Sequence, residues 1–174
     1  FNRPTIPGQF YPEVGFLFQD PSDQLFSASV RDDIAFAPKN MGLSPEEIDR
    51  RVRDAIALCG IEALADRPPH HLSGGEKQMV AIAGILAMHP RIVLYDEPTA
   101  SLDLRARRRL IQFLRQSEET LLIASHDLEF ILETCDRVIV MATGTIGVEG
   151  SSSQVMGDRD LMERYGLETP YSLR

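Results

Sequence analysis

The stretch Ile92-Val-Leu-Tyr-Asp-Glu-Pro-Thr99 carries most of the information about the fold. Its first four residues form an uninterrupted apolar run, which is typical of a strand covered on both faces, as in a parallel sheet. Asp96 and Glu97 follow at the end of this run. Successive side chains of a strand point to opposite faces, so a turn at the strand end lets the two carboxylates take different roles.

Similar apolar runs occur elsewhere and alternate with segments of helical periodicity. The predicted strands are residues 14–19, 92–95, 120–124 and 137–141, and two of the predicted helices are residues 104–116 and the segment carrying Leu128, Ile131, Leu132 and Cys135. Continuous apolar strands that alternate with amphipathic helices predict an α/β fold with a largely parallel sheet and helices on both faces.

Two further helix starts are marked by their residues. Ser44-Pro45-Glu46-Glu47 combines a capping serine, a proline at the first helical position and a glutamate at the third, and Gly60 is the expected C-terminal cap. A second helix opens at Leu72-Ser73-Gly74-Gly75 and is expected to end before Pro90. Outside these elements, residues 1–13 predict an irregular lead-in, glycines 144, 147 and 150 predict turns, and residues 151–174 predict a short helix with a polar end.

The composition excludes several classes of protein. A formal net charge of -8 opposes nucleic-acid binding, because phosphate contacts need clustered positive charge, and the arginines at 105 and 107–109 fit a solvated helix face. No apolar run approaches the roughly 18 to 20 residues that cross a bilayer. Cys59 and Cys135 lie on apolar phases of predicted helices, which favours reduced thiols over a disulfide or a zinc site. His70, His71 and His89 flank prolines or helix ends and show no metal-ligand spacing.

Leu72-Ser73-Gly74-Gly75-Glu76 has the composition of a phosphate-binding helix start. Two glycines let backbone N–H groups approach an anion, the serine adds a hydroxyl donor, and the N-terminal end of a helix favours negative charge. A serine cap followed by a glycine turn would look the same, so this pentapeptide alone favours function only modestly.

Taken together, these motifs identify the chain as a member of the ABC ATPases, since their order and spacing resemble that family over residues 14–150. The resemblance implies that Asp96 and Gln19 serve Mg²⁺, that Glu97 polarises the attacking water, and that His126 orients it at the γ-phosphate. Ser73, Gly74, Gly75 and Glu76 match the signature motif, which binds the ATP of a second ATPase subunit in trans, and Asp103 matches the D-loop. An acidic strand cap at 96–97 and a structural histidine at 126 are the simpler alternatives.

A finer resemblance points to the energy-coupling-factor group, which imports cobalt, nickel or vitamins. It is carried by residues 18–26 (FQDPSDQLF), 33–36 (DIAF), 67–73 (RPPHHLS) and 166–173 (GLETPYSL). The resemblance implies an ATPase on the cytoplasmic face of the cell membrane, with an integral membrane transporter subunit as partner and either a homodimer or a heterodimer of ATPase subunits. Soluble ABC ATPases of DNA repair or translation are a further class, but their insertions and positive charge are missing.

The expected domain layout is a lead-in at 1–13, a partial ATPase domain at 14–150 and a tail at 151–174. Within the domain, a helical subdomain covers about 31–90. The part covering about 91–150 bears the segment 92–99, which resembles the family's Walker B strand, together with the D-loop and the histidine.

The phosphate loop G-x-x-x-x-G-K-[ST] does not occur in the 174 residues. Only Lys39 and Lys77 are present, and neither follows a glycine or precedes Ser or Thr. We therefore expect the isolated chain to bind ATP weakly or not at all. Truncation, processing and a partial gene remain open as explanations, as does a non-catalytic module that donates its signature motif to an intact ATPase.

Overall fold

The computed structural model describes residues 8–174, which divide into two compact units. The first unit comprises residues 8–107 and 117–124, and the second comprises residues 108–116 and 125–174. Each unit is described by itself. The predicted lead-in lies partly outside the described residues, and its remainder, residues 8–13, forms turns.

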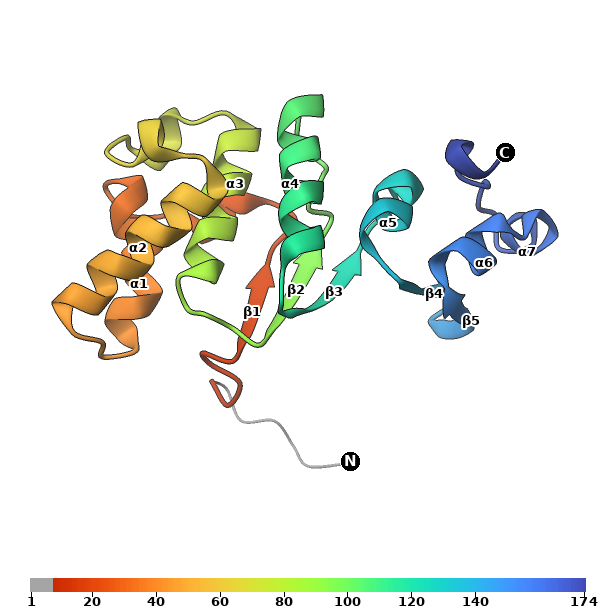
Figure 1. Cartoon of the computed structure of the whole chain (residues 1–174), viewed down its shortest axis with the longest axis horizontal. Coiled ribbons are helices and arrows are strands. Elements are labelled where there is room, and N and C mark those ends of the chain that lie inside the picture. Colours follow the sequence, from red (N-terminus) through yellow and green to blue (C-terminus); the bar gives the residue numbers. More distant parts are fainter. Residues whose placement is uncertain (1–7) are drawn as a thin grey trace. The chain divides into compact units, whose positions relative to one another are not determined.

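The first unit is built around a three-stranded parallel sheet (Figure 1). Its strands are β1 (Val14–Leu17), β2 (Ile92–Asp96) and β3 (Thr120–Ala124), in the order β1-β2-β3. Leu17 pairs with Tyr95, and Tyr95 pairs with Ile123. The predicted α/β class and the three strands are thus confirmed.

Helix α3 (Gly74–Leu86) lies beside β1 at one face of this sheet (Figure 1). Leu17, Val93 and Tyr95 point to that face and are at most 2% exposed. The helix approaches β1 so closely that a Cβ added at Gly15 would overlap the side chain of Ile85. A residue without a side chain is therefore required on the strand to admit the helix.

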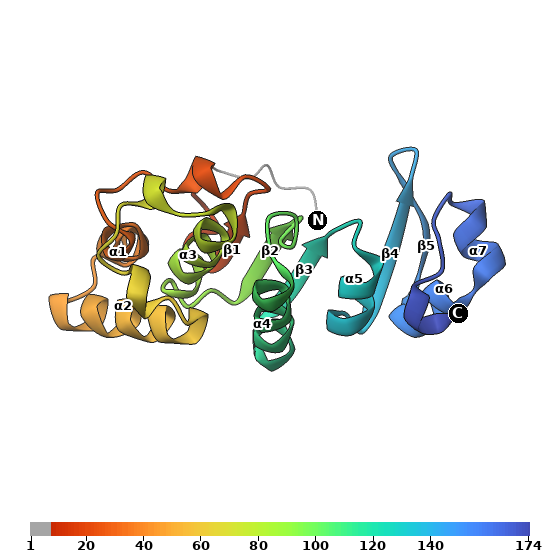
Figure 2. The same cartoon turned by 90° about the horizontal axis from the view of Figure 1, so that it is seen from above.

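Helices α1 (Val30–Asn40) and α2 (Pro45–Cys59) pack with α3 into a helical cluster (Figure 2). The predicted caps of α2 are confirmed, since the Ser44 side chain accepts from the Glu47 N–H and Gly60 has a left-handed φ of 63°. Helix α1, capped by Ser29, was not predicted from the residue pattern. Three single turns connect these elements: η1 (Pro21–Gln24), η2 (Glu62–Leu64) and η3 (Pro69–His71).

An arginine ties α2 to the end of α3. Arg51 donates one hydrogen bond to Glu47 Oε1 at 2.8 Å and others to the carbonyl oxygens of Ala87 at 3.4 Å and Met88 at 3.1 Å. These carbonyls end α3 without helical partners of their own, so a cation there is favourable. Arg50 and Arg51 hold the pKa of Glu47 down at about 2.

The second unit contains the rest of α4 (Leu104–Gln116), which begins in the first unit, and the elements that follow β3. These are α5 (Leu128–Thr134), β4 (Arg137–Ala142), β5 (Thr145–Ser151), α6 (Ser152–Gly157), α7 (Arg159–Arg164) and η4 (Tyr171–Leu173). The tail thus has two short helices and a single turn, where the sequence predicted one helix and a polar end. Its last turn is fixed to α5, because Ser172 donates through its hydroxyl and its N–H to Glu129 at 2.6 and 3.0 Å.

Three sequence predictions are wrong in this unit. The strand at 137–141 was expected in the parallel sheet but pairs with β5 as an antiparallel hairpin, because Thr143 and Gly144 both take positive φ and turn the chain back. Gly147 and Gly150 lie within β5 and not in turns, and a Cβ at Gly147 would meet the ring of Tyr165. Cys135 lies beyond the end of α5, where the backbone becomes extended toward β4, and is only half-buried, unlike Cys59.

The contact at Gly15 predicts a large destabilisation on adding one methyl group. Gly15→Ala should lower the free energy of unfolding by about 2 kcal/mol, because α3 must move off the sheet or Ile85 must leave its rotamer. Urea denaturation followed by circular dichroism measures this difference. Gly84→Ala in α3 is the matched control, since a Cβ there has nothing within 4 Å. An equal loss in both variants would contradict the assigned contact.

The Glu47 cluster predicts a pH dependence of stability. Because the pKa of Glu47 is about 2 in the folded chain and 4.5 is its ordinary value, its contribution is complete above pH 4.5 and is lost as the pH falls toward 2. Glu47→Gln should therefore lose less stability between pH 5 and pH 3 than the native chain. Thermal unfolding at both pH values measures this, with Asp49→Asn, beside Arg53, as control. If Glu47→Gln loses as much stability between pH 5 and pH 3 as the native chain, Glu47 is not the source of the pH dependence.

Candidate functional site

Three predicted site residues of the first unit, Gln19, Asp96 and Glu97, lie at the carboxyl-terminal edge of its sheet. Leu17 pairs with Tyr95 and Asp96 with Ala124, so the three strands end almost level. Gln19 follows β1 by two residues, Asp96 is the last residue of β2, and Glu97 comes directly after it. Ligands of open parallel sheets bind at this edge.

Glu97 has an uncommon backbone conformation. Its φ is 47°, in the left-handed region, and its N–H donates to the carbonyl oxygen of Ala124 at 2.9 Å. The hydrogen bond extends the β2–β3 ladder by one residue while the chain turns away from the strand. A non-glycine residue held there costs about 1 to 3 kcal/mol, and such strain is concentrated at functional sites. Both Asp96 and Glu97 are half-buried.

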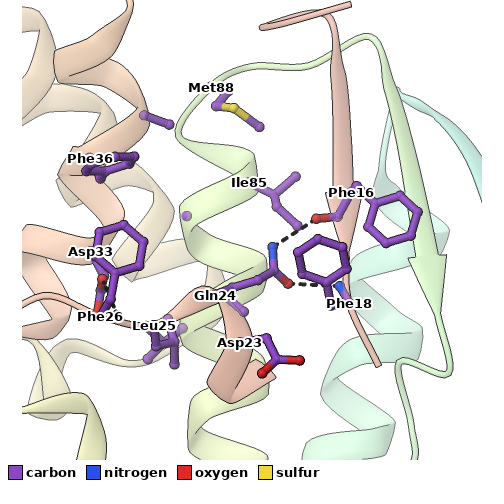
Figure 3. A pocket seen from close by; sticks show the side chains of 14 residues that line it. Phe16, Phe18, Asp23, Gln24, Leu25, Phe26, Asp33, Phe36, Ile85 and Met88 are labelled. Atoms are coloured by element: carbon purple, nitrogen blue, oxygen red, sulfur yellow. Dashed lines mark hydrogen bonds between the residues drawn. The ribbon is translucent and has the colours of Figure 1, made fainter. Parts of the chain in front are cut away.

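The exposed Gln19 lies in a loop held by its neighbours. Gln24 reaches back to the end of β1, where its Oε1 accepts from the Phe18 N–H at 2.8 Å and its Nε2 donates to the Phe16 carbonyl at 3.0 Å (Figure 3). Asp20 accepts from the Ser22 N–H at 2.8 Å, and Lys77 of α3 donates to Ser22 Oγ at 3.2 Å. The role of Gln24 was not predicted, although it lies inside the quoted motif of residues 18–26.

Beside this loop lies a groove of about 300 Å³ between η1, α1 and α3 (Figure 3). Its rim carries the largely exposed rings of Phe16, Phe18, Phe26 and Phe36. Asp33 is buried in its wall, where Oδ1 accepts from the N–H groups of Phe26 and Ser27, whereas Oδ2 has no hydrogen-bond partner. No sequence pattern predicted the groove, because its residues are spread over four elements.

The signature motif forms a reciprocal cap at the start of α3. Ser73 donates to Glu76 Oε2 through both its N–H and its hydroxyl, each at 2.8 Å, and accepts from the Glu76 N–H. These donors lower the pKa of Glu76. The serine hydroxyl that was expected to donate to a phosphate is thus engaged within the chain, and an arriving anion would compete with the Glu76 carboxylate.

The two signature glycines lie against the segment that precedes Asp103. A Cβ at Gly74 would come to 3.3 Å from Ser101 Cβ, and one at Gly75 would come to 3.3 Å from the Ser101 carbonyl oxygen. Asp103 itself accepts from the Ala106 N–H at 2.7 Å and so caps α4. The structure therefore brings the predicted D-loop and the signature motif into contact within the first unit.

His126 belongs to the second unit and is exposed. It lies between Ser125 and Asp127, whose N–H donates to Ser125 Oγ at 3.1 Å. The Asp127 carboxylate caps α5 by accepting from the Phe130 N–H at 2.9 Å. These two hydrogen bonds fix the backbone on both sides of the histidine.

This chain can supply only part of the coordination of a magnesium ion, and the remaining ligands would come from the nucleotide and water. No group of three His, Cys, Asp or Glu side chains that could hold a metal occurs among residues 8–174. Mg²⁺ at nucleotide sites is held by one or two carboxylates, waters and the substrate phosphates, and Asp96 at the strand end could be one of these carboxylates.

Among residues 8–174, no helix has the length and apolarity that crossing a membrane requires.

The sequence is similar to those of known ABC transporter proteins. The family model described as ABC transporter matches residues 5–100. A putative ABC transporter ATP-binding protein of Synechocystis is 64% identical over 167 residues, which cover 96% of this chain and 59% of that protein. The energy-coupling factor transporter ATP-binding protein EcfA of Methanocaldococcus jannaschii is 41% identical over 90% of this chain and 57% of its own length. The chain thus spans somewhat less than three fifths of these two relatives.

Solved structures show the same architecture. The structure of cbiO1 from Clostridium perfringens, described as part of the ABC transporter complex cbiONQ, superposes with a TM-score of 0.77 and 40% identity over 87% of this chain and 62% of that one. The ATP-binding cassette MJ0796, in a dimeric structure bound to ADP and Pi, superposes with a TM-score of 0.72 and 26% identity. The match covers 80% of this chain and 63% of that one. From its motifs, its sheet and these matches, the chain belongs to the ABC transporter family of ATP-binding proteins.

Proposed function

We propose that this chain is part of the ATP-hydrolysing subunit of an ABC transporter. The observation that carries the proposal is the strained Glu97, held in the left-handed region directly after Asp96 at the edge of the sheet where ligands bind. Asp96 ends the strand and Glu97 begins the turn, so the two carboxylates can take different roles, one toward a metal and the other toward a water molecule. A simple acidic strand cap would not need a strained backbone.

The resemblance to the ABC ATPases implies the roles of the residues. Glu97 polarises the attacking water, His126 orients it, and Asp96 with Gln19 serves the Mg²⁺ that accompanies the nucleotide. Mg²⁺, when bound, neutralises charge on the phosphates. The Gln24 and Asp20 hydrogen bonds keep Gln19 at the end of β1, and the Asp127 cap holds the backbone next to His126.

The signature motif acts on a second ATPase subunit. Ser73, Gly74, Gly75 and Glu76 lie at the start of α3, where amide groups and the helix dipole favour an anion. The dimeric cassette among the structural relatives supports an arrangement of two ATPase subunits, identical or different. Asp103 stands in the segment that touches the signature glycines and would link the two nucleotide sites.

The second partner is an integral membrane transporter subunit, with the ATPase at the cytoplasmic face of the cell membrane. Four exposed phenylalanine rings beside the Gln19 loop give an apolar groove of a kind that protein partners cover. Similarity to EcfA and to a member of the cbiONQ complex supports an importer of the energy-coupling-factor type, with cobalt, nickel or a vitamin as cargo.

One observation favours a second candidate function. The 174 residues contain no glycine-lysine phosphate loop, so the chain could serve as a non-catalytic module that donates its signature motif to an intact ATPase. Ser73→Arg tests this second function, since it should abolish the activity of a mixed complex in which only the partner hydrolyses ATP.

Nucleotide titration tests the missing phosphate loop. Without the amides and the lysine of that loop, the isolated chain should bind Mg-ATP with a dissociation constant of about 1 mM or weaker. Isothermal calorimetry measures this value, and the complete Synechocystis relative serves as the positive control. Micromolar affinity of the isolated chain would overturn the expectation.

Substitutions at position 97 test the link between strain and function. Glu97→Gly should be more stable than Glu97→Gln by about 1 kcal/mol, because glycine adopts positive φ without steric cost. In a complete ATPase subunit both should abolish hydrolysis. Urea unfolding and phosphate release measure the two effects. At the preceding strand residue the order of stability should reverse, with Asp96→Gly less stable than Asp96→Asn. If the glycine variant is less stable than the amide variant at both positions, Glu97 is not strained.

A further inference from the structure

The motif at residues 166–173 (GLETPYSL) ends in a turn that is closed by its own hydrogen bonds. The N–H of Leu173 donates to the Pro170 carbonyl oxygen at 3.0 Å. The guanidinium of Arg174 donates to the Thr169 carbonyl oxygen, also at 3.0 Å. The turn η4 therefore has a defined shape, yet the proposed nucleotide chemistry gives it no role.

This turn is bound to α5 through one carboxylate. Ser172 donates to both oxygens of Glu129, through its N–H to Oε1 at 3.0 Å and through its hydroxyl to Oε2 at 2.6 Å. The Ser172 hydroxyl and N–H, together with the N–H of Tyr171, lower the pKa of Glu129, so this carboxylate is charged at neutral pH. Hydrogen bonds to a charged acceptor are roughly twice as strong as neutral ones. Leu173 adds an apolar contact to α6, because its Cδ1 lies 4.0 Å from the position of a Cβ at Gly157.

The bound carboxylate lies close to the predicted histidine along the chain. Glu129 belongs to the first turn of α5 and comes three residues after His126. A helix of seven residues is not stable without contacts from outside. Asp127 caps this first turn by accepting from the Phe130 N–H at 2.9 Å. Ser172 therefore binds the same turn whose capping residue adjoins the histidine.

We propose that Glu129 and Ser172 are positioning residues for His126, and that the turn η4 is a strap that holds the histidine-bearing end of α5 in place. All three residues belong to the second unit. The inference rests on the proposed function, in which the imidazole orients the attacking water. Misplacing a catalytic group by about 1 Å can lower a rate by about a hundredfold, so a strap on a short helix has a direct effect on turnover. The motif 166–173 gains a role, since it brings Ser172 to Glu129.

Ser172→Ala in the 174-residue chain tests the strap without any measurement of activity. Loss of the hydroxyl should raise the hydrogen-exchange rate of the Phe130 amide at least about threefold, because the first turn of α5 opens more often. The imidazole NMR resonances of His126 should shift, whereas those of the other three histidines, which lie in the first unit, should not. Ser172→Thr keeps the hydroxyl and should behave like the native chain. Ser153→Ala, at an exposed serine of α6, is the matched control.

Kinetics of a complete ATPase subunit that contains these residues test the positioning role. Ser172→Ala and Glu129→Gln should each lower kcat about fivefold and change the KM for Mg-ATP less than about twofold, because the histidine acts on the reacting water. The double variant should lose little more than either single variant, since both break the same contact. Glu163→Gln, whose carboxylate accepts from Arg159 within α7, is the matched charge control and should change neither constant.

The outcomes separate this inference from the proposed function. If Ser172→Ala leaves both the Phe130 exchange rate and the His126 resonances unchanged, the inference is overturned. Faster exchange at Phe130 with unchanged His126 resonances also overturns it, because the turn then stabilises α5 without positioning the histidine. An equal loss of kcat in Glu129→Gln and Glu163→Gln has the same consequence. Shifted His126 resonances, together with a native complete subunit that hydrolyses no ATP, support the strap and contradict the proposed ATPase.

Discussion

The contact between α3 and β1 at Gly15 is the constraint on which the first unit depends. One side of α3 lies against the sheet, while its other sides pack on α1 and α2. Its N-terminus carries the signature motif, and its C-terminal carbonyls are held by Arg51. A single helix therefore fixes the sheet, the helical cluster and the segment 73–76 relative to each other. The absence of a side chain at position 15 is what permits this arrangement.

Much of this architecture could be predicted because its signals are local. The Ser44 and Gly60 caps, the apolar run at 92–95 and the serine cap at Ser73 each depend on residues a few positions apart. The hairpin of β4 and β5 escaped prediction because its apolar run resembles that of a parallel strand, and only the Thr143-Gly144 turn distinguishes the two. Helix α1 was not predicted because Pro38 interrupts the helical pattern of the sequence near the end of the helix.

In the candidate site, the sequence predicts which residues take part but not their geometry. The sequence predicted Gln19, Asp96, Glu97 and residues 73–76 as site residues by their type and order, and these assignments stay predictions. It could not reveal the positive φ of Glu97, which depends on the hydrogen bond to Ala124 in another strand. Nor could it assign Gln24, whose side chain bonds to backbone groups at the end of β1, or the groove whose phenylalanines come from β1, from the loop after η1 and from α1. Such features arise from long-range packing, which no local pattern encodes.

The approach of Gly75 to the Ser101 carbonyl has a mechanical consequence. Two backbones meet there without side chains between them, so no rotamer change can absorb a displacement of either one. A shift of the segment that follows Glu97 must move the amide groups at the start of α3 by a similar amount. A displacement of the segment that carries Ser101 is therefore transmitted directly to the start of α3.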